Sequence, residues 1–442
     1  MLTISLIKAF LWVIRFALTV YAAYFVSISL FSFRREPLFP AHSPEKRFAV
    51  IVPARNEAAV IGQLIESLLH QDYPRELFDI FVIPNNCSDN TREVAESAGA
   101  KILECTIPIH SKGEVLAYIL PLLMDPPASA DAAPPYDAFL FFDADNLAHP
   151  GFLAAMNNAA CTGVRAAQGY RDSKNPGDTI ISGCTSIYYW TINRFLNRAK
   201  SAVGLSAMIN GTGFMVAVSL LRDLGGWHTI TMGEDNEFST LCAFRGKKVA
   251  WVPEARTYDE QPLTFKESWQ QRKRWSSGVI QGLSLYGWRL FRASFKPHGI
   301  LCFDQWMNCI SPVMQVLYVF SVLIQFGLEW FPVRSFVFPG DDTFYRAFLS
   351  IPGSYLFTTL LAIVVVLMEH RSLHKVVKGI LAYGLFIFSW IPINFMCLIK
   401  TDSEWREVRH TRSMSIHELA PSAKNQEPPV VPKETESSGD GE

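Results

Sequence analysis

Asp143 and Asp145 are the first residues in the chain whose types and spacing could carry out chemistry. They close the apolar stretch AFLFFDAD and stand two positions apart. Side chains two apart on a strand point to the same side, so both carboxylates can meet one ligand. Two hard oxygen ligands suit Mg²⁺ or Mn²⁺, with a diphosphate completing the coordination shell. A DxD pair alone also occurs in surface turns, so its meaning depends on the surrounding fold.

Glu234 and Asp235 form a second acidic pair, within GGWHTITMGEDNEFS. They stand at the start of a stretch with helical spacing. Acids in the first turn stabilise a helix through its dipole, which is the structural explanation. A carboxylate near a metal site can also take the proton from an attacking hydroxyl. This segment alone leaves both explanations open.

The segment QQRKRW, residues 270 to 275, combines three cations with a tryptophan. On a helix, Gln271, Arg274 and Trp275 share one face because they are three and four residues apart. Arginine can donate two hydrogen bonds to a phosphate, and the tryptophan face can hold a sugar ring. The alternative is an interfacial helix whose cations meet lipid headgroups and whose tryptophan lies in the aromatic belt. Composition alone favours that alternative.

Residues 48 to 250 alternate between short apolar stretches and helical patterns. The apolar stretches FAVIVPA, FDIFVIPNN, AKILEC and AFLFFDAD read as strands. This alternation predicts an α/β fold with a mostly parallel sheet and helices on both faces. Ligands of such folds bind beyond the carboxyl ends of the strands, where PARNE, NNCSD and DAD all fall. The three polar clusters therefore predict one crevice.

Apolar segments flank this region. Residues 1–33 predict a transmembrane anchor rather than a cleaved signal peptide, because the run is long and cations follow it on what should be the cytoplasmic side. Residues 46–290 are expected to form a cytoplasmic catalytic domain that ends in interfacial helices. Residues 291–400 hold apolar runs at 307–328, 351–368 and 379–399, each near the length of a span.

The charge pattern around the late apolar runs conflicts with a simple count of spans. Basic residues between the last two runs, and others after residue 400, both indicate the cytoplasmic side. One late segment could therefore be re-entrant or interfacial. The remaining tail, 401–442, is polar from about residue 421, and we expect disorder from there.

Composition excludes several classes of protein. The net charge of −1 gives no basic field for nucleic acid. Eight cysteines without a CxxC pair argue against a zinc site or a disulfide scaffold, and they fit a reducing compartment.

The segments VPARNEAAVI, NNCSDNT, SKGEVL, FFDAD, NGTGFMV, GGW…GED and QRKRW, in this order before membrane helices, resemble membrane-embedded family 2 glycosyltransferases. Cellulose, hyaluronan, chitin-type and poly-N-acetylglucosamine synthases belong to that family. The resemblance covers about residues 48 to 290. It implies a GT-A fold, a nucleotide-sugar donor that is most often UDP-linked, a divalent cation (Mg²⁺ or Mn²⁺), and inversion at the anomeric carbon.

The resemblance also implies roles for individual residues. Asp235 would be the catalytic base with Glu234 beside it, and Asp145 would ligate the metal. Gly211, Thr212 and Trp275 would contact the acceptor. The donor would be bound by Glu57, Asn85, Asp89, Lys112, Asp143, Gln271, Arg272 and Arg274.

Two departures from the family pattern stand out. Asn85 and Asn86 stand where many relatives have an acid, which weakens the prediction of nucleotide preference. Gly233 takes the place of the threonine that often precedes the acidic pair.

Two activities and one non-catalytic role fit these residues. The leading expectation is a processive synthase that elongates a polysaccharide and threads it through its own helices, with accessory export proteins left open. The alternative is transfer of one sugar to a membrane lipid such as a diacylglycerol or a ceramide-like acceptor. A non-catalytic membrane protein is disfavoured by the intact acidic motifs. We expect an integral protein of a bacterial plasma membrane whose partners are a nucleotide sugar, the acceptor and the bilayer, not nucleic acid.

Overall fold

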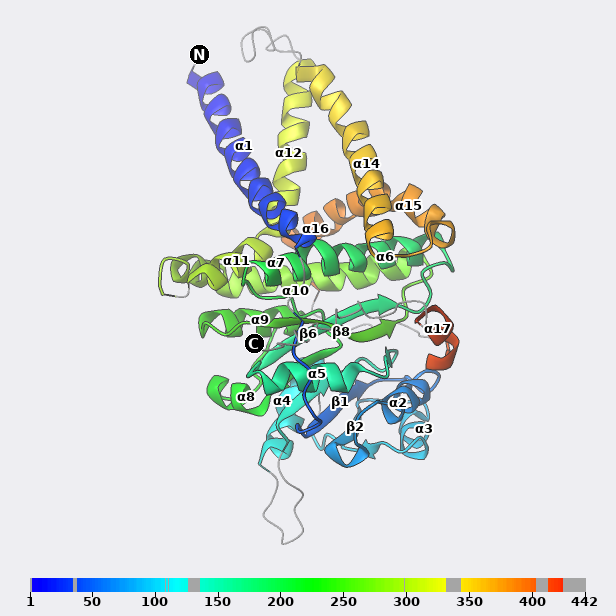
Figure 1. Ribbon diagram of the computed structural model, residues 1–442. Helices are drawn as coiled ribbons and strands as arrows, with labels where there is room; N and C mark the ends of the chain where they lie inside the picture. The colour runs from blue at the N-terminus through cyan, green and yellow to red at the C-terminus, as the bar shows by residue number, and fades with distance from the viewer. Residues whose placement is uncertain are drawn as a thin grey trace, which may run out of the picture.

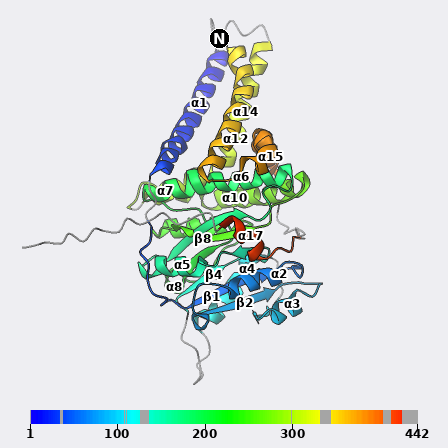
Figure 2. The same cartoon turned by 45° about the vertical axis from the view of Figure 1, so that its right-hand side comes forward.

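The chain folds into a sheet domain, a layer of helices that covers one side of it, and a group of helices that projects away (Figures 1 and 2). The computed structural model describes residues 2–34, 38–107, 109, 111–125, 136–297, 299–330, 343–402 and 412–423. In Figure 1 the sheet domain lies below, α6, α10 and α11 run across its top, and α1, α12 and α14 rise above them.

The sheet in the described ranges has eight strands in the order β3-β2-β1-β4-β7-β6-β8-β5. Four of its neighbouring pairs are parallel and three are antiparallel. The predicted α/β sheet of mainly parallel pairs is confirmed, although β7 runs antiparallel to both of its neighbours. The strands are β1 Phe48–Ala54, β2 Phe78–Pro84, β3 Lys101–Ile102, β4 Ala138–Phe141, β5 Leu147–Ala148, β6 Ala166–Ser173, β7 Phe214–Ala217 and β8 Ala250–Asp259.

Helices cover both faces of the sheet. On one face α2 and α5 bury side chains such as Leu64 and Met156 against Val50. On the other face α4 and α9 contribute Leu116 and Phe238. The helices of this domain are α2 Ile61–Leu69, η2 Arg75–Leu77, α3 Thr91–Ser97, α4 Lys112–Met124, α5 Phe152–Cys161, α6 Ile180–Ile192, the π-helical η3 Asn193–Arg198, α7 Ala199–Ala202, α8 Val218–Leu224 and α9 Glu234–Phe244.

The second core extends beyond the sheet into the late helices. It joins strand residues such as Phe141 to Trp190 of α6, and then to Val365 of α14 and Ile380 of α15. The sheet domain and the late apolar helices thus share one core. The remaining helices are α1 Leu2–Ser29, η1 Leu30–Phe33, α10 Phe265–Ala293, α11 Gly299–Cys309, α12 Ser311–Trp330, α14 Thr343–Met368, α15 Leu373–Phe388, α16 Trp390–Ile399 and α17 Ile416–Ala423.

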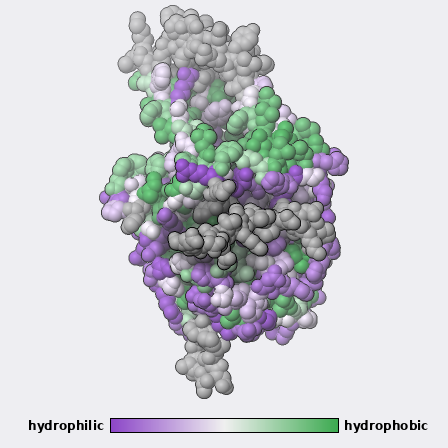
Figure 3. All heavy atoms as spheres, in the orientation of Figure 1, coloured by the Kyte–Doolittle hydropathy of each residue, from purple (hydrophilic) through white to green (hydrophobic). Residues whose placement is uncertain are grey.

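Two helical stretches in the described part of the chain, 9–33 and 373–399, are long and apolar enough to cross a membrane. A third becomes possible if α11 and the first part of α12, which meet at a bend of 49°, count as one span. The predicted run 307–328 therefore crosses this bend instead of forming one straight helix. Hydrophobic residues gather at the level of these helices, whereas the sheet domain is mainly hydrophilic (Figure 3).

The two helices of the 373–399 stretch lie against the sheet domain's own helices. Gly379 of α15 meets Gly183 of α6 so closely that an added Cβ on Gly379 would lie 2.8 Å from the carbonyl carbon of Gly183. Further along, Ser276 of α10 donates a hydrogen bond of 2.7 Å to Asn394 of α16. Such contacts fit the interfacial or re-entrant segment considered in the sequence.

The chain returns to the sheet domain at α17, where Ile416 is buried with Leu147 and Tyr258. This helix extends to Ala423, slightly beyond the expected start of disorder. The rest of that expectation, from 424 on, lies outside the described residues.

Candidate active site

A cavity of about 720 Å³ extends from the carboxyl ends of the central strands to the helices α1, α12 and α16. Its size is typical of sites for small-molecule ligands. Eleven residues predicted for the site line it: Glu57, Asn85, Lys112, Asp143, Asp145, Gly211, Glu234, Asp235, Gln271, Arg274 and Trp275. The structure does not bring Asp89, Thr212 and Arg272 into this lining.

The DxD motif follows β4 and lies beside the start of α4. Lys112 Nζ donates to Asp143 Oδ1 at 2.5 Å and to the Gly211 carbonyl at 2.7 Å. Burial is the largest single influence on Asp143 and opposes its ionisation, but the charge and hydrogen bond of Lys112 together with nearby arginines outweigh burial and lower the pKa of this carboxyl. Arg274 adds to that lowering, so the arginine of α10 lies within electrostatic reach of the motif. Asp143 is therefore held as a carboxylate inside a partly cationic environment.

The acidic pair begins α9, as the sequence predicted. Burial raises the pKa of Glu234 to about 7, and the neighbouring Asp235 adds to the rise while Lys112 opposes it. Burial also raises the pKa of Asp235, although a hydrogen bond of 2.7 Å from the Asn236 N–H to its Oδ1 opposes this. Carboxyl groups with raised pKa values inside a cavity are suited to accept a proton near neutral pH.

Gly211 and Gly233 leave space around Asp235. Gly211 has φ +80°, and a Cβ there would lie 3.5 Å from Asp235 Oδ2. Gly233 faces Gly278 of α10. A Cβ added to Gly278 would lie only 2.5 Å from the Gly233 nitrogen. The glycine that departs from the family pattern therefore lies where α10 approaches the backbone before α9. This contact brings the acidic pair of α9 next to α10.

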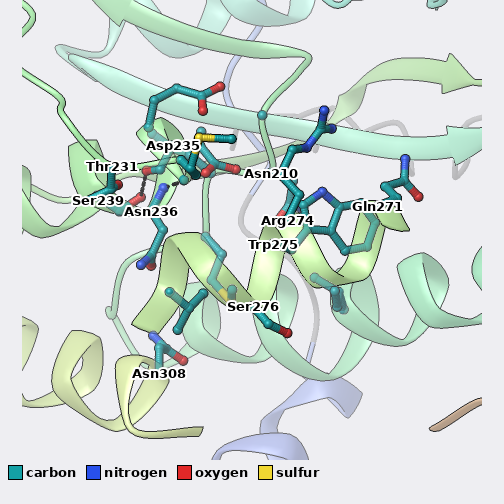
Figure 4. Close-up of a pocket in the computed structure, with 18 of the residues that line it drawn as sticks. Asn210, Thr231, Asp235, Asn236, Ser239, Gln271, Arg274, Trp275, Ser276 and Asn308 are labelled. Atoms are coloured by element: carbon teal, nitrogen blue, oxygen red, sulfur yellow. Dashed lines mark hydrogen bonds between the residues drawn. The ribbon is translucent and has the colours of Figure 1, made fainter. Parts of the chain in front are cut away.

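One face of α10 points into the cavity. Figure 4 shows Gln271, Arg274 and Trp275 together on this helix, with Asp235 and Asn236 of α9 nearby. The Gln271 Oε1 atom is buried and has no hydrogen-bond partner. The helical spacing predicted this common face, and the structure confirms it.

Trp275 belongs to an aromatic wall of the cavity. Its ring lies nearly parallel to Tyr188, with centroids 6.5 Å apart, and at 26° to Trp390, with centroids 6.1 Å apart. All three rings line the cavity. Trp275 is therefore not simply a residue of an outward-facing aromatic belt.

Arg272 points to the opposite side of α10. Its side chain donates to the Phe386 carbonyl at 3.2 Å and to Ser389 Oγ at 2.6 Å, and it is 1% exposed. Burial lowers the pKa of Arg272 to about 10. Its position contradicts the predicted contact with the diphosphate, because two steps along a helix turn a side chain by about 200°. The motif match had included this residue although the helical spacing had not.

Thr212 and Asp89 hold loops in place instead of lining the cavity. Thr212 Oγ1 accepts a hydrogen bond of 3.1 Å from the Asp143 N–H and donates to Asn146. Asp89 accepts a hydrogen bond of 3.1 Å from the Ala58 N–H, which ties the loop after β2 to the loop after β1. Both side chains therefore shape the neighbours of the predicted ligands, and their own predicted contacts with donor and acceptor stay predictions.

Sequence reasoning missed Arg171, which lies on β6 and lines the cavity. Its guanidinium donates to Asp259 at 2.5 and 2.8 Å and lies 4.1 Å from the centre of the Tyr189 ring. Burial raises the pKa of Asp259 to about 6, although Arg171 opposes this. No local motif marks Arg171, because its partners stand 18 and 88 positions away. The strand AAQGYRDS also contains Gln168, Asp172 and Ser173, so its composition does not single out Arg171 either.

The residues present are compatible with a divalent cation. Asp145 is 7% exposed, lines the cavity and accepts a hydrogen bond of 3.3 Å from the Glu260 N–H. The described residues contain no group of three or more His, Cys, Asp or Glu side chains that could hold a metal alone. Mg²⁺ is commonly bound by one or two carboxylates plus substrate phosphates, so Asp145 with a diphosphate is a sufficient donor set.

The fold and this cavity define a GT-A glycosyltransferase. The structure is similar to "Mannosyltransferase PcManGT from Pyrobaculum calidifontis in complex with GDP-Man and Mn2+", with a TM-score of 0.58 and 17% identity over 87% of this chain and 99% of that one. At this level of identity the likeness concerns the fold. The family model "Glycosyltransferase like family 2" matches residues 44–278, and the chain belongs to this family.

Curated relatives include both polymer and lipid enzymes. A probable glycosyltransferase YdaM of Bacillus subtilis is 26% identical over 52% of this chain and 55% of its own. A beta-monoglucosyldiacylglycerol synthase of Trichormus variabilis is 24% identical over 53% and 49%. A poly-beta-1,6-N-acetyl-D-glucosamine synthase of Staphylococcus epidermidis is 22% identical over 79% and 80%. The chain matches about half the length of the first two.

Proposed function

We propose that the protein transfers a sugar, with inversion, from a nucleoside-diphosphate donor to a hydroxyl group of an acceptor at the membrane boundary. One observation supports this most strongly: a single cavity contains the DxD motif, the acidic pair of α9 and the Gln271–Arg274–Trp275 face of α10. Single displacement needs a base on the acceptor side and stabilisation of the leaving diphosphate on the other, and these groups can supply both.

Asp235 acts as the base in this proposal. Its raised pKa suits removal of the acceptor's hydroxyl proton, and Gly211 leaves room for that hydroxyl beside Oδ2. Arg274 and Gln271 hold the diphosphate, and Lys112 keeps Asp143 ionised and in place. A Mg²⁺ or Mn²⁺ ion on Asp145 would neutralise charge on the leaving group. Glu57 and Asn85 contact the nucleotide end of the donor.

The donor is proposed to be a UDP-sugar, as the family resemblance implies. Because an asparagine replaces the acid that many relatives carry, GDP-sugars form the alternative to test. The catalytic domain is proposed to face the cytoplasm of a bacterial cell, where nucleotide sugars are made. A growing polysaccharide and a membrane lipid would both present their hydroxyl to Asp235.

Asp235→Asn tests the proposal directly. We expect transfer to fall by at least about a thousandfold, because the amide cannot accept the proton. Binding of the donor's nucleoside diphosphate, measured by isothermal titration calorimetry, should change little. Transfer at the wild-type rate would exclude Asp235 as the base.

A further inference from the structure

The cavity changes chemical character between the sheet and the membrane helices. Near the strands its lining is charged, with Asp143, Asp145 and Arg274. The lining from α11, α12 and α16 includes the amides of Asn308, Gln315 and Asn394 and no charged side chain. Beside these amides, apolar side chains of the same region line the cavity, among them Leu18, Ala22, Met314 and Ile391. Charged, uncharged polar and apolar linings therefore belong to one continuous space.

Asn308 offers a hydrogen-bond donor to this space. Its Oδ1 accepts a hydrogen bond of 3.1 Å from Lys200 Nζ, and Lys200 is fully buried. Lys200 is itself held by Asp304 at 3.0 Å. Because a cation holds the oxygen, the amide orientation is fixed with Nδ2 as the free end. That Nδ2 is buried without a hydrogen-bond partner, so it is available to a polar ligand.

The apolar part of the cavity reaches the outer surface of the membrane helices. Leu18, Tyr21 and Ala22 of α1 line it on one side, and Met314 and Tyr318 of α12 on the other. Tyr318 is 40% exposed although it lines the cavity. Residues 9–33 have the length and apolar composition of a membrane span, and the first part of α12 does so only together with α11, across their bend. In a bilayer crossed by these helices, the cavity lining between α1 and α12 would face hydrocarbon.

We propose that the acceptor is an amphiphilic membrane lipid with a hydroxylated headgroup. Its tail lies between α1 and α12, a polar headgroup atom accepts a hydrogen bond from Asn308 Nδ2, and its free hydroxyl reaches Asp235. This inference rests on the proposed function. In the reaction the bond between the lipid oxygen and the anomeric carbon forms, and the bond from that carbon to the diphosphate breaks. The hydroxyl proton goes to Asp235, and the nucleoside diphosphate leaves with the bonding electrons.

A hydrophilic polysaccharide fits the membrane end less well. A sugar chain leaving there would pass the apolar side chains of Leu18, Ala22 and Met314, at an opening that faces lipid. The amides of Asn308, Gln315 and Asn394 could pair with only a few hydroxyls of a sugar chain, and polar groups placed in hydrocarbon without partners are strongly unfavourable. An acyl chain has no polar groups to desolvate, so it incurs no such cost in the same place. The membrane end of the cavity therefore favours a lipid over a polymer.

The class of product tests the proposal. Membranes that contain the full chain are incubated with radiolabelled UDP- and GDP-sugars and then extracted with chloroform and methanol. The material that the solvents leave behind is sized by gel filtration. A labelled lipid with one sugar is expected. A labelled polymer would overturn the lipid proposal and leave the transferase function intact. No labelled product from any donor would instead contradict the proposed function itself.

A pair of substitutions on α1 tests the route of the lipid. Leu18→Trp fills the apolar end of the cavity and should reduce transfer to lipid about tenfold, or about 1.4 kcal/mol. Val20→Trp is the control: Val20 is 46% exposed and does not line the cavity, so transfer should stay within about twofold. Equal rates for the two variants would overturn the proposed route. Calorimetric binding of the nucleoside diphosphate verifies that both variants are folded.

Asn308→Leu tests the headgroup contact. Loss of the donor should raise the KM for the lipid on the order of tenfold and leave the KM for the nucleotide sugar within about twofold. A rise in both constants, or in neither, would remove Asn308 from the acceptor site. This split distinguishes a direct contact from a general loss of structure.

Discussion

Arg272 and Arg274 stand two residues apart on α10, yet their surroundings are opposite. Arg272 is 1% exposed and uses its hydrogen bonds on α15 and on Ser389, whereas Arg274 lines the cavity near Asp143. Burial already separates them, because Arg272 is buried and Arg274 is only partly buried. They also differ in their contacts: Arg272 donates through Nε and Nη1 to groups of the protein, whereas Arg274 lines the cavity.

The same contrast recurs on α9. Glu237 is fully buried, and its carboxylate accepts from the N–H groups of Ile230 and Thr231 at 2.8 and 2.7 Å and from Tyr286 at 2.6 Å. Asp235, two residues earlier, lines the cavity. Each helix thus presents charged side chains to the cavity (Arg274 on α10, Glu234 and Asp235 on α9) and uses another to hold the scaffold. Substitutions should separate these two classes by their effects on activity and on stability.

Arg274→Ala should give the largest effect on activity within this comparison. Loss of a group that stabilises the leaving diphosphate should lower kcat/KM about a hundredfold or more. The midpoint of thermal unfolding should stay close to that of the wild type, because Arg274 lines the cavity and is only partly buried. A large loss of stability with normal specific activity would indicate that Arg274 supports the scaffold and does not bind the diphosphate.

Trp275→Ala should have a smaller effect, confined to the acceptor. Removal of the ring should raise the KM for the acceptor on the order of tenfold, since aromatic contacts are worth about 1 kcal/mol each. The affinity for the nucleotide sugar should change little, which parallel titrations of donor and acceptor can measure. Equal effects on both substrates would indicate that Trp275 only supports the aromatic wall.

The pH dependence of transfer should show that Glu234 acts in the cavity and does not merely hold the scaffold. Its pKa is raised to about 7, so the ionised form is lost as pH falls through that value. Transfer in the wild type should therefore decline below neutral pH as the acidic pair takes up a proton. In Glu234→Gln the acidic limb should move to lower pH by about one unit, because a neighbouring negative charge is gone. An unchanged limb in rate measurements between pH 5 and 9 would contradict this.

Arg272→Ala should have the smallest effect on activity. We expect a loss of about 2 kcal/mol in stability from the lost packing and hydrogen bonds, seen as a lower unfolding midpoint. Activity per folded molecule should stay within about threefold of the wild type. A hundredfold loss of activity per folded molecule would indicate that Arg272 does contact the diphosphate.

The sequence predicted the parts of the site that depend on local geometry. Strand ends placed Glu57, Asn85 and Asp143 at one edge of the sheet, and helical spacing placed Arg274 and Trp275 on one face. These relations follow from fixed periods of two and 3.6 residues. Arg272 was included by matching a motif rather than by spacing, and the structure places it on the other side of the helix.

Long-range packing explains what the sequence could not predict. Arg171 acquires its role from Asp259 and Tyr189, and the membrane end of the cavity combines α1 with α12, nearly 300 residues later. Periodicity within a segment carries no information about which distant segment it meets. The bend between α11 and α12 was missed for a similar reason, because the apolar run itself is continuous.

The contact between Gly233 and Gly278 limits how far the distance between α9 and α10 can vary in the active site. Where two backbones touch without side chains between them, their spacing depends on van der Waals contact between backbone atoms and not on rotamers. The separation of the acidic pair from Arg274 is then insensitive to drift in the surrounding core. Substitutions can therefore change the acceptor end of the cavity, while the contact between Gly233 and Gly278 keeps the acidic pair of α9 at a constant distance from Arg274.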